Sequence, residues 1–282
     1  MSVKTFAAID VGSFELTMKI FDFSGKNTMR EIDCIHQRID LGSDTYANGK
    51  ISNEKMDDLC HTLKEFSQIM ESYKVIAYKA YGTSAIRETE NTLILQDQIE
   101  QRTGIRVEIL SNSEQRFLDY KSIASKGETF RRIIEEKTAI LDIGGGSIQI
   151  SLFDKDTLVS TQNLRLGVLR LQELLNHLNA GSTQMEQLVD ELATAQLDDY
   201  KKLYLKDREI KNIIIVDDYL SPWAVRKAHE RGDGNAMVDS KAFYQLMEAL
   251  RTRGTTELAK RMDIAEEKVP LVYISAILTR RI

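Results

Sequence analysis

The first forty residues alternate between apolar and polar positions, and a helical spacing follows them. The two-residue period typical of strands covers residues 5–11, 15–22 and 31–41. After Ser52, whose hydroxyl suits a helix N-cap, apolar side chains recur every three to four positions as far as Tyr73. The stretch 45–52 contains the turn pair Asn48-Gly49, so it is predicted to be a loop.

Strand and helix patterns then alternate, and the whole order restarts near residue 138. In the first part, strands are predicted at 75–82 and 105–110 and helices at 91–104 and from Ser113, which gives the order βββαβαβα. In the second part, two strands flank a glycine-rich loop, and the later predicted segments are a strand near 158–166, helices over 168–178 and 183–206, and a strand over 210–217. Helical patterns follow to the end of the chain.

The repeated order of elements predicts one architecture built twice. Each half would hold a mixed sheet with a hairpin at its N-terminal edge and helices on its faces, which is an α/β fold. Sequence identity between the halves is slight, so this interpretation depends on the order of the elements and on a pair of similar loops. A single α/β domain with a helical tail is the alternative.

The loop in the second half carries more glycine than a turn between two strands requires. Asp142 is followed, after one residue, by Gly144, Gly145, Gly146 and Ser147. One or two glycines suffice for a tight turn, whereas three allow successive backbone N–H groups to line a concavity for an oxyanion. Ser147 adds a hydroxyl donor. Because a carboxylate repels phosphate, Asp142 is predicted to hold hydrated Mg²⁺ or a water that bridges to phosphate.

The loop in the first half follows the same pattern with fewer glycines. Asp10, Gly12 and Ser13 lie between the first two predicted strands. Two such loops on two domains are expected to face each other across a cleft and to hold a phosphate chain from both sides, with Asp10 as a second carboxylate for Mg²⁺. A flexible hairpin tip is the alternative for each loop taken alone.

Composition and charge limit the classes of function. The chain has 282 residues, of which 42% are hydrophobic and 29% are charged, and its formal net charge is −5. These values fit a globular protein of two domains, and without a long basic run they argue against a nucleic-acid surface. The two cysteines, Cys34 and Cys60, favour a reducing compartment. With no signal peptide and no apolar run of membrane length, a cytoplasmic protein is expected.

Six segments of the chain resemble successive motifs of one protein family. They are AIDVGS, LGSDTYANGKIS, GTSAIRETEN, GIRVEILSNSEQ, LDIGGGS and LRLGVLRL. In order and spacing they are similar to the motifs of the exopolyphosphatase/guanosine pentaphosphate phosphatase family, over nearly the whole chain. This resemblance implies the actin/sugar-kinase/Hsp70 superfamily and two actin-like (ribonuclease H-like) domains, which we place at 1–122 and 123–282 with a cleft between them.

The resemblance also implies an activity. Members of the family remove the terminal phosphate of inorganic polyphosphate or of pppGpp with Mg²⁺ and an attacking water, so polyphosphate or guanosine penta/tetraphosphate is the expected partner, and a homodimer is expected. Arg87, in GTSAIRETEN, is the best candidate cation for phosphate, because a guanidinium forks onto two oxygens; a structural salt bridge is the alternative. Members continue with a short strand and helix beyond the position of Ile282, so the chain is either part of a longer protein or a shortened member.

The departures from the family fall where its chemistry is expected. Two adjacent glutamates of the family align with Glu114 and Gln115, and the second resembles the catalytic base. The glutamate after the glycine-rich loop, which the resemblance implicates in handling water and metal, aligns with Gln149. Glutamine keeps the hydrogen bonding of glutamate but takes up no proton near neutral pH. Glu114 is either a substitute base or an ordinary first-turn residue favoured by the helix dipole.

Three interpretations remain open from the sequence. In the first, which we adopt, the protein is a hydrolase with Gln115, Glu114, Gln149 and Asp142 as candidate catalytic residues, because phosphoryl transfer needs positioning and charge stabilisation more than a strong base. In the second, a catalytically weakened protein binds polyphosphate or (p)ppGpp and acts as a regulator. The third, a small-molecule kinase, is the least favoured, because the sequence contains no motif for an acceptor pocket.

Overall fold

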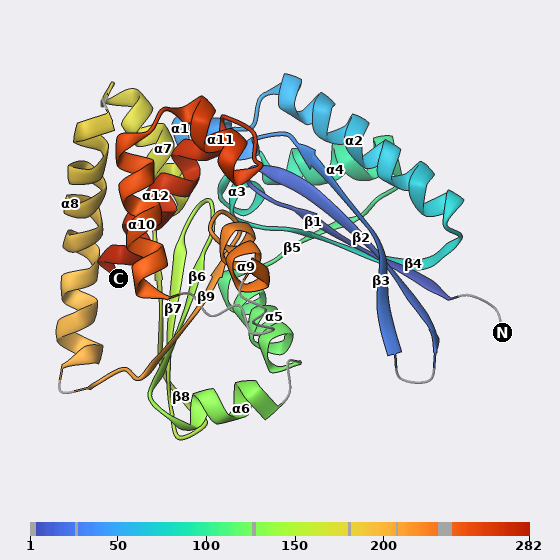
Figure 1. Ribbon diagram of the computed structural model, residues 1–282. Coiled ribbons are helices and arrows are strands. Elements are labelled where there is room, and N and C mark those ends of the chain that lie inside the picture. Colours follow the sequence, from blue (N-terminus) through green and yellow to red (C-terminus); the bar gives the residue numbers. More distant parts are fainter. Residues whose placement is uncertain (1–3, 26–27, 126–127, 180–181, 207, 231–238) are drawn as a thin grey trace. The chain divides into compact units, whose positions relative to one another are not determined.

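The chain forms a mixed α/β structure in two compact units. The structure, a computed structural model, describes residues 4–25, 28–125, 128–179, 182–206, 208–230 and 239–282. Unit 1 comprises residues 1–121 and unit 2 comprises residues 122–282. Each unit is built on one mixed sheet (Figure 1), so the predicted α/β architecture, with a mixed sheet formed twice, is confirmed.

Unit 1 contains a five-stranded sheet. Its strands are β1 Thr5–Val11, β2 Glu15–Gly25, β3 Thr28–Arg38, β4 Val75–Gly82 and β5 Val107–Ile109, in the spatial order β3-β2-β1-β4-β5. The helices are α1 Leu41–Asn48, α2 Asn53–Ser72, α3 Ser84–Glu88, α4 Thr92–Thr103 and α5, which spans Asn112–Ala124 and so continues past the end of the unit. β1 is antiparallel to β2 and parallel to β4, and β4 is parallel to β5.

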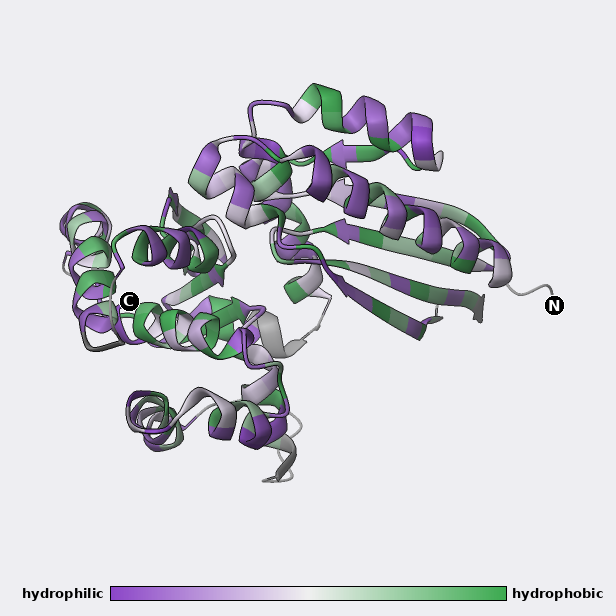
Figure 2. Ribbon diagram, turned by 90° about the horizontal axis from the view of Figure 1, so that it is seen from above, coloured by the Kyte–Doolittle hydropathy of each residue, from purple (hydrophilic) through white to green (hydrophobic). Residues whose placement is uncertain are grey.

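The core of unit 1 lies between the sheet and helices α2 and α4, which run along one of its faces (Figure 1). Ile9 and Val11 of β1 are buried there with Leu59 of α2 and Leu95 of α4. The alternate residues of each strand point to the opposite face, and hydrophobic and hydrophilic bands alternate along these strands (Figure 2). The sequence period of two is therefore visible as one covered and one polar sheet face.

The segment before α2 differs from the prediction. Residues 45–52 are predicted to be a loop, but Leu41–Asn48 forms helix α1, so the prediction is wrong for the first part of that stretch. Leu41 and Thr45, one turn apart, are both buried, and Gly49 ends the helix in the left-handed conformation with φ 75°. The predicted cap of α2 is confirmed, because Ser52 Oγ accepts a hydrogen bond from the backbone N–H of the third helical residue at 3.3 Å.

Unit 2 contains a four-stranded sheet with a larger set of helices. Its strands are β6 Thr138–Ile143, β7 Ile148–Asp154, β8 Thr157–Leu164 and β9 Asn212–Asp217, in the order β8-β7-β6-β9. The helices are α6 Glu128–Glu135, α7 Val168–His177, α8 Ser182–Tyr200, α9 Ser221–Glu230, α10 Ser240–Thr252, α11 Thr255–Met262 and α12 Lys268–Arg281, and a π-helix at Lys201–Leu205 extends α8. β6 is antiparallel to β7 and parallel to β9.

The two faces of the unit 2 sheet differ in chemistry. Leu141 and Ile150 lie directly opposite each other on β6 and β7, and with Leu197 and Tyr200 of α8 they line an apolar cavity of about 110 Å³. The next opposed pair, Asp142 and Gln149, points to the other face because successive side chains alternate. The sheet is therefore apolar toward α8 and polar on the opposite side near the glycine-rich loop.

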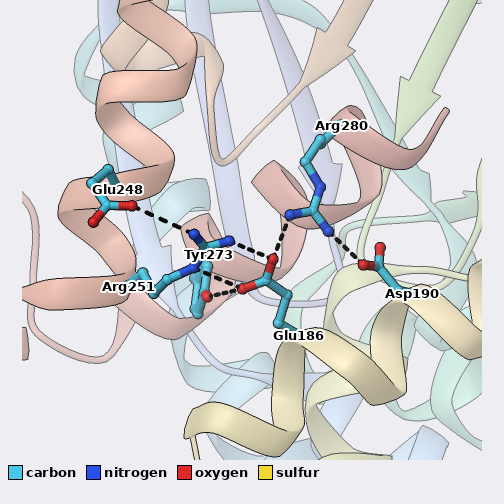
Figure 3. A network of polar contacts seen from close by, with 6 residues as sticks. All are labelled: Glu186, Asp190, Glu248, Arg251, Tyr273 and Arg280. Carbon is cyan, nitrogen blue, oxygen red and sulfur yellow. Dashed lines mark hydrogen bonds and ion pairs between the residues drawn. The ribbon is translucent and has the colours of Figure 1, made fainter.

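A network of charged side chains joins α8 to α10 and α12 (Figure 3). Glu186 of α8 accepts hydrogen bonds from Arg251 Nη2 at 2.7 Å, from the Tyr273 hydroxyl at 2.9 Å and from Arg280. Arg280 also donates to Asp190. These contacts, led by the hydrogen bond from Arg251, hold the pKa of Glu186 at about 2. The network thus links α8, α10 and α12 to one another through side-chain hydrogen bonds.

Candidate phosphate site

Three segments with predicted site residues leave the sheet of unit 1 at the same edge. Val11, Gly82 and Ile109 are aligned across the parallel strands β1, β4 and β5. The segments that follow these strands are the Gly12-Ser13 loop, helix α3 with Arg87, and the start of α5 with Glu114 and Gln115. Ligands of parallel α/β sheets bind outside the carboxyl ends of the strands. The fold therefore gathers the predicted site residues of unit 1 at the edge where a ligand is expected.

The hairpin loop after β1 is too tight for a side chain at Gly12. Its N–H donates to Glu15 O at 3.2 Å, and a Cβ added at Gly12 would lie 2.7 Å from that same oxygen. Asp10, two residues before, is exposed on β1. The glycine is thus required by the turn, and the carboxylate before it faces solvent.

The hydroxyl of Ser13 is bonded to two other hydroxyls. Ser13 Oγ lies 2.9 Å from Tyr46 OH and 2.9 Å from Ser84 Oγ, and the last two are 3.0 Å apart. Ser13 and Ser84 are buried. Sequence reasoning missed both partners: Ser84 lies inside the GTSAIRETEN motif without an assigned role, and nothing in the sequence distinguishes Tyr46. Ser13 is therefore part of a closed hydroxyl cluster that joins β1–β2, α1 and α3.

Arg87 connects α3 to the start of α5. Its Nη1 donates to Leu110 O at 2.7 Å and to Gln115 Oε1 at 3.2 Å, and burial lowers the pKa of the guanidinium. Both acceptors are neutral oxygens, and the neighbouring Glu88 carboxylate acts on the guanidinium through space. The structure thus brings together two of the predicted residues, Arg87 and Gln115.

Glu114 has a structural role at the start of α5. Its Oε2 accepts from the Ser111 backbone N–H at 2.9 Å, and its own N–H donates to Ser111 Oγ at 3.2 Å. This reciprocal pair is a capping box. The hydrogen bonds from Ser111 lower the pKa of the exposed Glu114 carboxyl. The first-turn role therefore accounts for Glu114.

The glycine-rich loop of unit 2 turns its carbonyl groups toward α7. Val168 N–H donates to Gly144 O at 3.0 Å, Leu169 N–H to Gly145 O at 2.9 Å, and Arg170 Nε–H to Gly146 O at 2.9 Å. In a trans peptide the N–H points away from the preceding C=O. The N–H groups of Gly145, Gly146 and Ser147 are consequently directed away from α7, as the anion-binding interpretation of the loop requires.

Gly167, at the N-cap of α7, makes this arrangement possible. A Cβ added there would lie 2.1 Å from Gly146 C and 2.3 Å from Gly145 O, which no side chain can tolerate. The glycine is part of the LRLGVLRL segment, yet sequence reasoning gave it no role. The loop and the first turn of α7 are therefore packed backbone to backbone.

The glycine-rich loop closes the hairpin that carries the other predicted residues of unit 2. Helix α12 contacts both α7 and α8, and α8 covers the apolar face of the sheet. The opposite face carries Asp142 and Gln149, where Gln149 Nε2 donates to Asp142 Oδ2 at 3.2 Å. The predicted residues of unit 2 thus form one group, with three backbone donors next to a carboxylate and an amide.

A buried carboxylate that sequence reasoning did not select ends the neighbouring strand β9 on the other face of the sheet. Asp217 ends β9 opposite Ile143 and is 3% exposed. It accepts from Leu220 N–H at 2.8 Å and from the Ser275 hydroxyl, and burial raises the pKa of its carboxyl. Asp217 therefore has a structural role inside unit 2, where these partners hydrogen-bond its carboxylate.

Asp10 and Asp142, the predicted Mg²⁺ ligands, belong to different units. Within the part of the chain that the structure describes, no three side chains of His, Cys, Asp or Glu are grouped as a metal site. Asp142 nevertheless fits magnesium, because Mg²⁺ is commonly held by one or two carboxylates together with the phosphates of the substrate.

Among the described residues, no helix is both long and apolar enough to cross a membrane.

Solved structures establish the fold. An exopolyphosphatase from Cytophaga hutchinsonii superposes with a TM-score of 0.76 at 20% identity, covering 99% of this chain and 89% of that one. The Ppx/GppA family member of Aquifex aeolicus gives a TM-score of 0.74 at 16% identity, covering 99% and 90%. The two units therefore have the actin-like fold of these proteins, as the sequence resemblance implies.

Sequence comparison gives the family. Exopolyphosphatase 1 of Mycobacterium tuberculosis is 27% identical over 144 residues, which is 51% of this chain and 40% of the relative. A bifunctional 3-dehydroquinate synthase/phosphatase of Fusobacterium nucleatum is 23% identical over 210 residues, 70% of this chain and 31% of the relative. The matches thus span less than half the length of these curated relatives. The model of the Ppx/GppA phosphatase family matches residues 21–263, and the chain belongs to this family.

Proposed function

We propose that the protein is a hydrolase that removes the terminal phosphate of inorganic polyphosphate, of pppGpp or of both by attack of water. The observation that carries the proposal is the orientation of the glycine-rich loop: its carbonyls are bonded to α7, so three consecutive amide N–H groups point away from that helix. Consecutive amides of this kind bind phosphate oxygens. Relatives named exopolyphosphatase and guanosine-5'-triphosphate,3'-diphosphate pyrophosphatase indicate the two candidate substrates.

Each unit carries its own proposed binding residues. In unit 2, the N–H groups of Gly145, Gly146 and Ser147, with the Ser147 hydroxyl, are the proposed donors to phosphate. In unit 1, Arg87 supplies the positive charge, since its two contacts both use Nη1 and end on neutral oxygens. A phosphate that bound there would compensate the half-buried guanidinium, whose pKa is lowered by desolvation. Asp10, Gly12 and Ser13 shape the edge beside Arg87.

Magnesium is part of the proposal through Asp142, with Asp10 as the second expected carboxylate. When bound, Mg²⁺ would neutralise phosphate charge that develops during transfer. Gln149 Nε2 donates to Asp142 Oδ2 at 3.2 Å, and the Asp142 carboxylate is the proposed contact with the hydrated ion. The amide therefore orients the carboxylate and reduces its ability to rotate.

A binding protein without turnover is the second candidate, and one observation favours it specifically. Two of the three positions where the family resemblance implies a glutamate, Gln115 and Gln149, hold an amide, and Gln115 Oε1 accepts from Arg87. An amide oxygen in that contact takes up no proton, and loss of a general base costs about 10²–10⁴ in rate. In that case the protein is a regulator that senses polyphosphate or (p)ppGpp.

Phosphate release from long-chain polyphosphate and from pppGpp, with and without Mg²⁺, separates the two candidates. We expect Mg²⁺-dependent release by the wild type. If the wild type binds both compounds without release while Gln115→Glu/Gln149→Glu releases phosphate, the regulator is correct. Arg87→Lys tests the binding residue: losing one charge-assisted hydrogen bond of about 1.5 kcal/mol weakens binding about tenfold, whereas Arg106→Lys, at an exposed position, leaves it unchanged.

The proposal also includes domains at 1–122 and 123–282, a cytoplasmic location and a homodimer. The homodimer is tested by the mass of the protein in solution as a function of its concentration. A strict monomer at high concentration contradicts it.

A further inference from the structure

Three polar residues form a straight row across the sheet of unit 2. Asp142 on β6 is directly opposite Gln149 on β7, and Gln149 is directly opposite Asn163 on β8. Residues that are opposite each other in an antiparallel pair lie on the same face, with Cβ atoms about 4.5–5.5 Å apart. The row is therefore one continuous strip of a carboxylate and two amides on the polar face. Asn163 has no assigned role in the sequence.

The row contains two buried acceptors without donors. A carboxylate only accepts, so Gln149 presents its Nε2 to Asp142 Oδ2, at 3.2 Å, and its Oε1 on the other side. Gln149 is 4% exposed. Its Oε1 and the Oδ1 of Asn163 are both buried and have no hydrogen-bond partner among the described residues. A buried acceptor without a donor is destabilising, so the pair favours a small ligand that donates two hydrogen bonds.

The row lies next to the glycine-rich loop. Asp142 and Gln149 are the second opposed pair of the hairpin, directly after Ile143 and Ile148, which close the loop. A phosphate held by the N–H groups of the loop and a small ligand held by the row would therefore be neighbours.

We propose that Gln149 Oε1 and Asn163 Oδ1 bind the water that attacks phosphorus, an assignment that rests on the proposed hydrolase function. The water donates one hydrogen bond to each amide oxygen, and a lone pair of the water oxygen then points away from the two amides. A bond then forms between the water oxygen and the terminal phosphorus while the bond from phosphorus to the bridging oxygen breaks. The shortened chain leaves with the bridging oxygen, and a proton of the water passes to an oxygen of the released phosphate.

This arrangement explains hydrolysis although Gln115 and Gln149 hold amides where the family resemblance implies glutamates. Neither amide has to accept a proton, because a metaphosphate-like transition state depends on positioning and charge stabilisation more than on a strong base. The two oxygens fix the direction of the nucleophile, and the loop fixes the direction of the phosphate. Asn163 is accordingly a catalytic residue of the proposed reaction.

The test compares two substitutions of Asn163 in the full chain. Asn163→Leu is similar in shape but has no acceptor, whereas Asn163→Asp keeps an acceptor oxygen at the same place. Loss of water positioning in Asn163→Leu is expected to lower kcat about 10²-fold with unchanged KM and unchanged affinity for polyphosphate. The Tm should not fall, because leucine removes a buried acceptor rather than a satisfied one. Asn163→Asp should retain most of the activity.

Gln162→Leu is the matched control, since Gln162 is exposed on the same strand and points to the other face. It should leave kcat unchanged. An active wild type whose kcat is unaffected by Asn163→Leu overturns the water site alone. A loss of kcat that follows a fall in Tm or in polyphosphate affinity also overturns it, because Asn163 is then structural or holds phosphate. A wild type that releases phosphate from neither substrate overturns the proposed function and this assignment together.

Discussion

The hairpin loops of the two units share a sequence pattern but differ in which polar groups are already bonded. In unit 1, Ser13 O accepts from Gly42 N–H at 2.7 Å and its hydroxyl contacts two other hydroxyls. In unit 2, the carbonyls of the loop are bonded to α7, and its N–H groups face the opposite side. The shared Asp-x-Gly therefore specifies a tight hairpin end, while the neighbouring elements decide whether that end is closed or open to a ligand.

The strand beside each hairpin contributes to this difference. In unit 1, the parallel neighbour β4 leads into Ser84, whose hydroxyl closes the cluster around Ser13. In unit 2, the parallel neighbour β9 ends in Asp217, whose carboxylate bonds inward to Leu220 N–H and Ser275. In unit 1 the segment after β4 therefore hydrogen-bonds to the loop hydroxyl. In unit 2 the carboxylate at the end of β9 hydrogen-bonds to its own segment and to α12 instead of to the loop.

The largest effect is expected from a substitution that disrupts the glycine-rich loop of unit 2. In Gly167→Ala the new Cβ would lie 2.1 Å from Gly146 C, so the loop must move away from α7 and lose its hydrogen bonds. We expect a loss of about 1–3 kcal/mol or more in the free energy of unfolding, together with loss of polyphosphate binding. Denaturant unfolding and a binding titration measure both.

Gly254→Ala is the control for that substitution. Gly254 is the N-cap of α11 with φ −68° and ψ 151°, against φ −66° and ψ 150° at Gly167, and an added Cβ there meets nothing within 4 Å. The two variants share the cost of replacing glycine at an N-cap. Equal losses of stability would contradict the role given to the close approach of α7 and the loop.

The second prediction contrasts the two serines. Ser13→Ala removes a buried hydroxyl with two partners, so it should lower the free energy of unfolding by about 0.5–1.5 kcal/mol, and Ser84→Ala should act non-additively with it. Ser147→Ala should leave stability unchanged and weaken polyphosphate binding. Thermal unfolding and binding of the two single variants give the comparison directly. If both serines affected stability alone, the loop of unit 2 would be as closed as that of unit 1.

Much of the fold could be predicted because it depends on periodicity and local capping. The strand pattern of β1 and the cap at Ser52 are local signals, and both are present as predicted. Helix α1 was missed because Leu41 and Thr45 gain their burial from distant segments. The partners of the candidate site were missed for the same reason: Tyr46 and Asn163 acquire meaning only through strand register and packing, which no short motif encodes.

The third prediction concerns the pH dependence of unit 2. Burial raises the pKa of Asp217, so the folded state prefers the protonated carboxyl. This contribution to stability is present below the ordinary aspartate pKa of 3.8 and is lost as the pH rises through the folded pKa. Asp217→Asn should remove that part of the slope of Tm against pH. An unchanged slope would contradict the account, and Asp218→Asn, at the adjacent exposed position, is the control.

The smallest effect separates capping from catalysis at the start of α5. Glu114→Gln keeps the acceptor of the capping box but loses its charge, so it should lower stability only slightly at pH 7 and leave kcat unchanged, whereas Glu114→Ala should lower Tm further without changing kcat. Because hydrogen bonds from Ser111 lower the pKa of Glu114, its contribution is present above the ordinary glutamate pKa and is lost as the pH falls through the folded value. A stable Glu114→Gln protein with reduced kcat would instead make Glu114 the base, and the edge of unit 1 would then contribute to the chemistry as well as to binding.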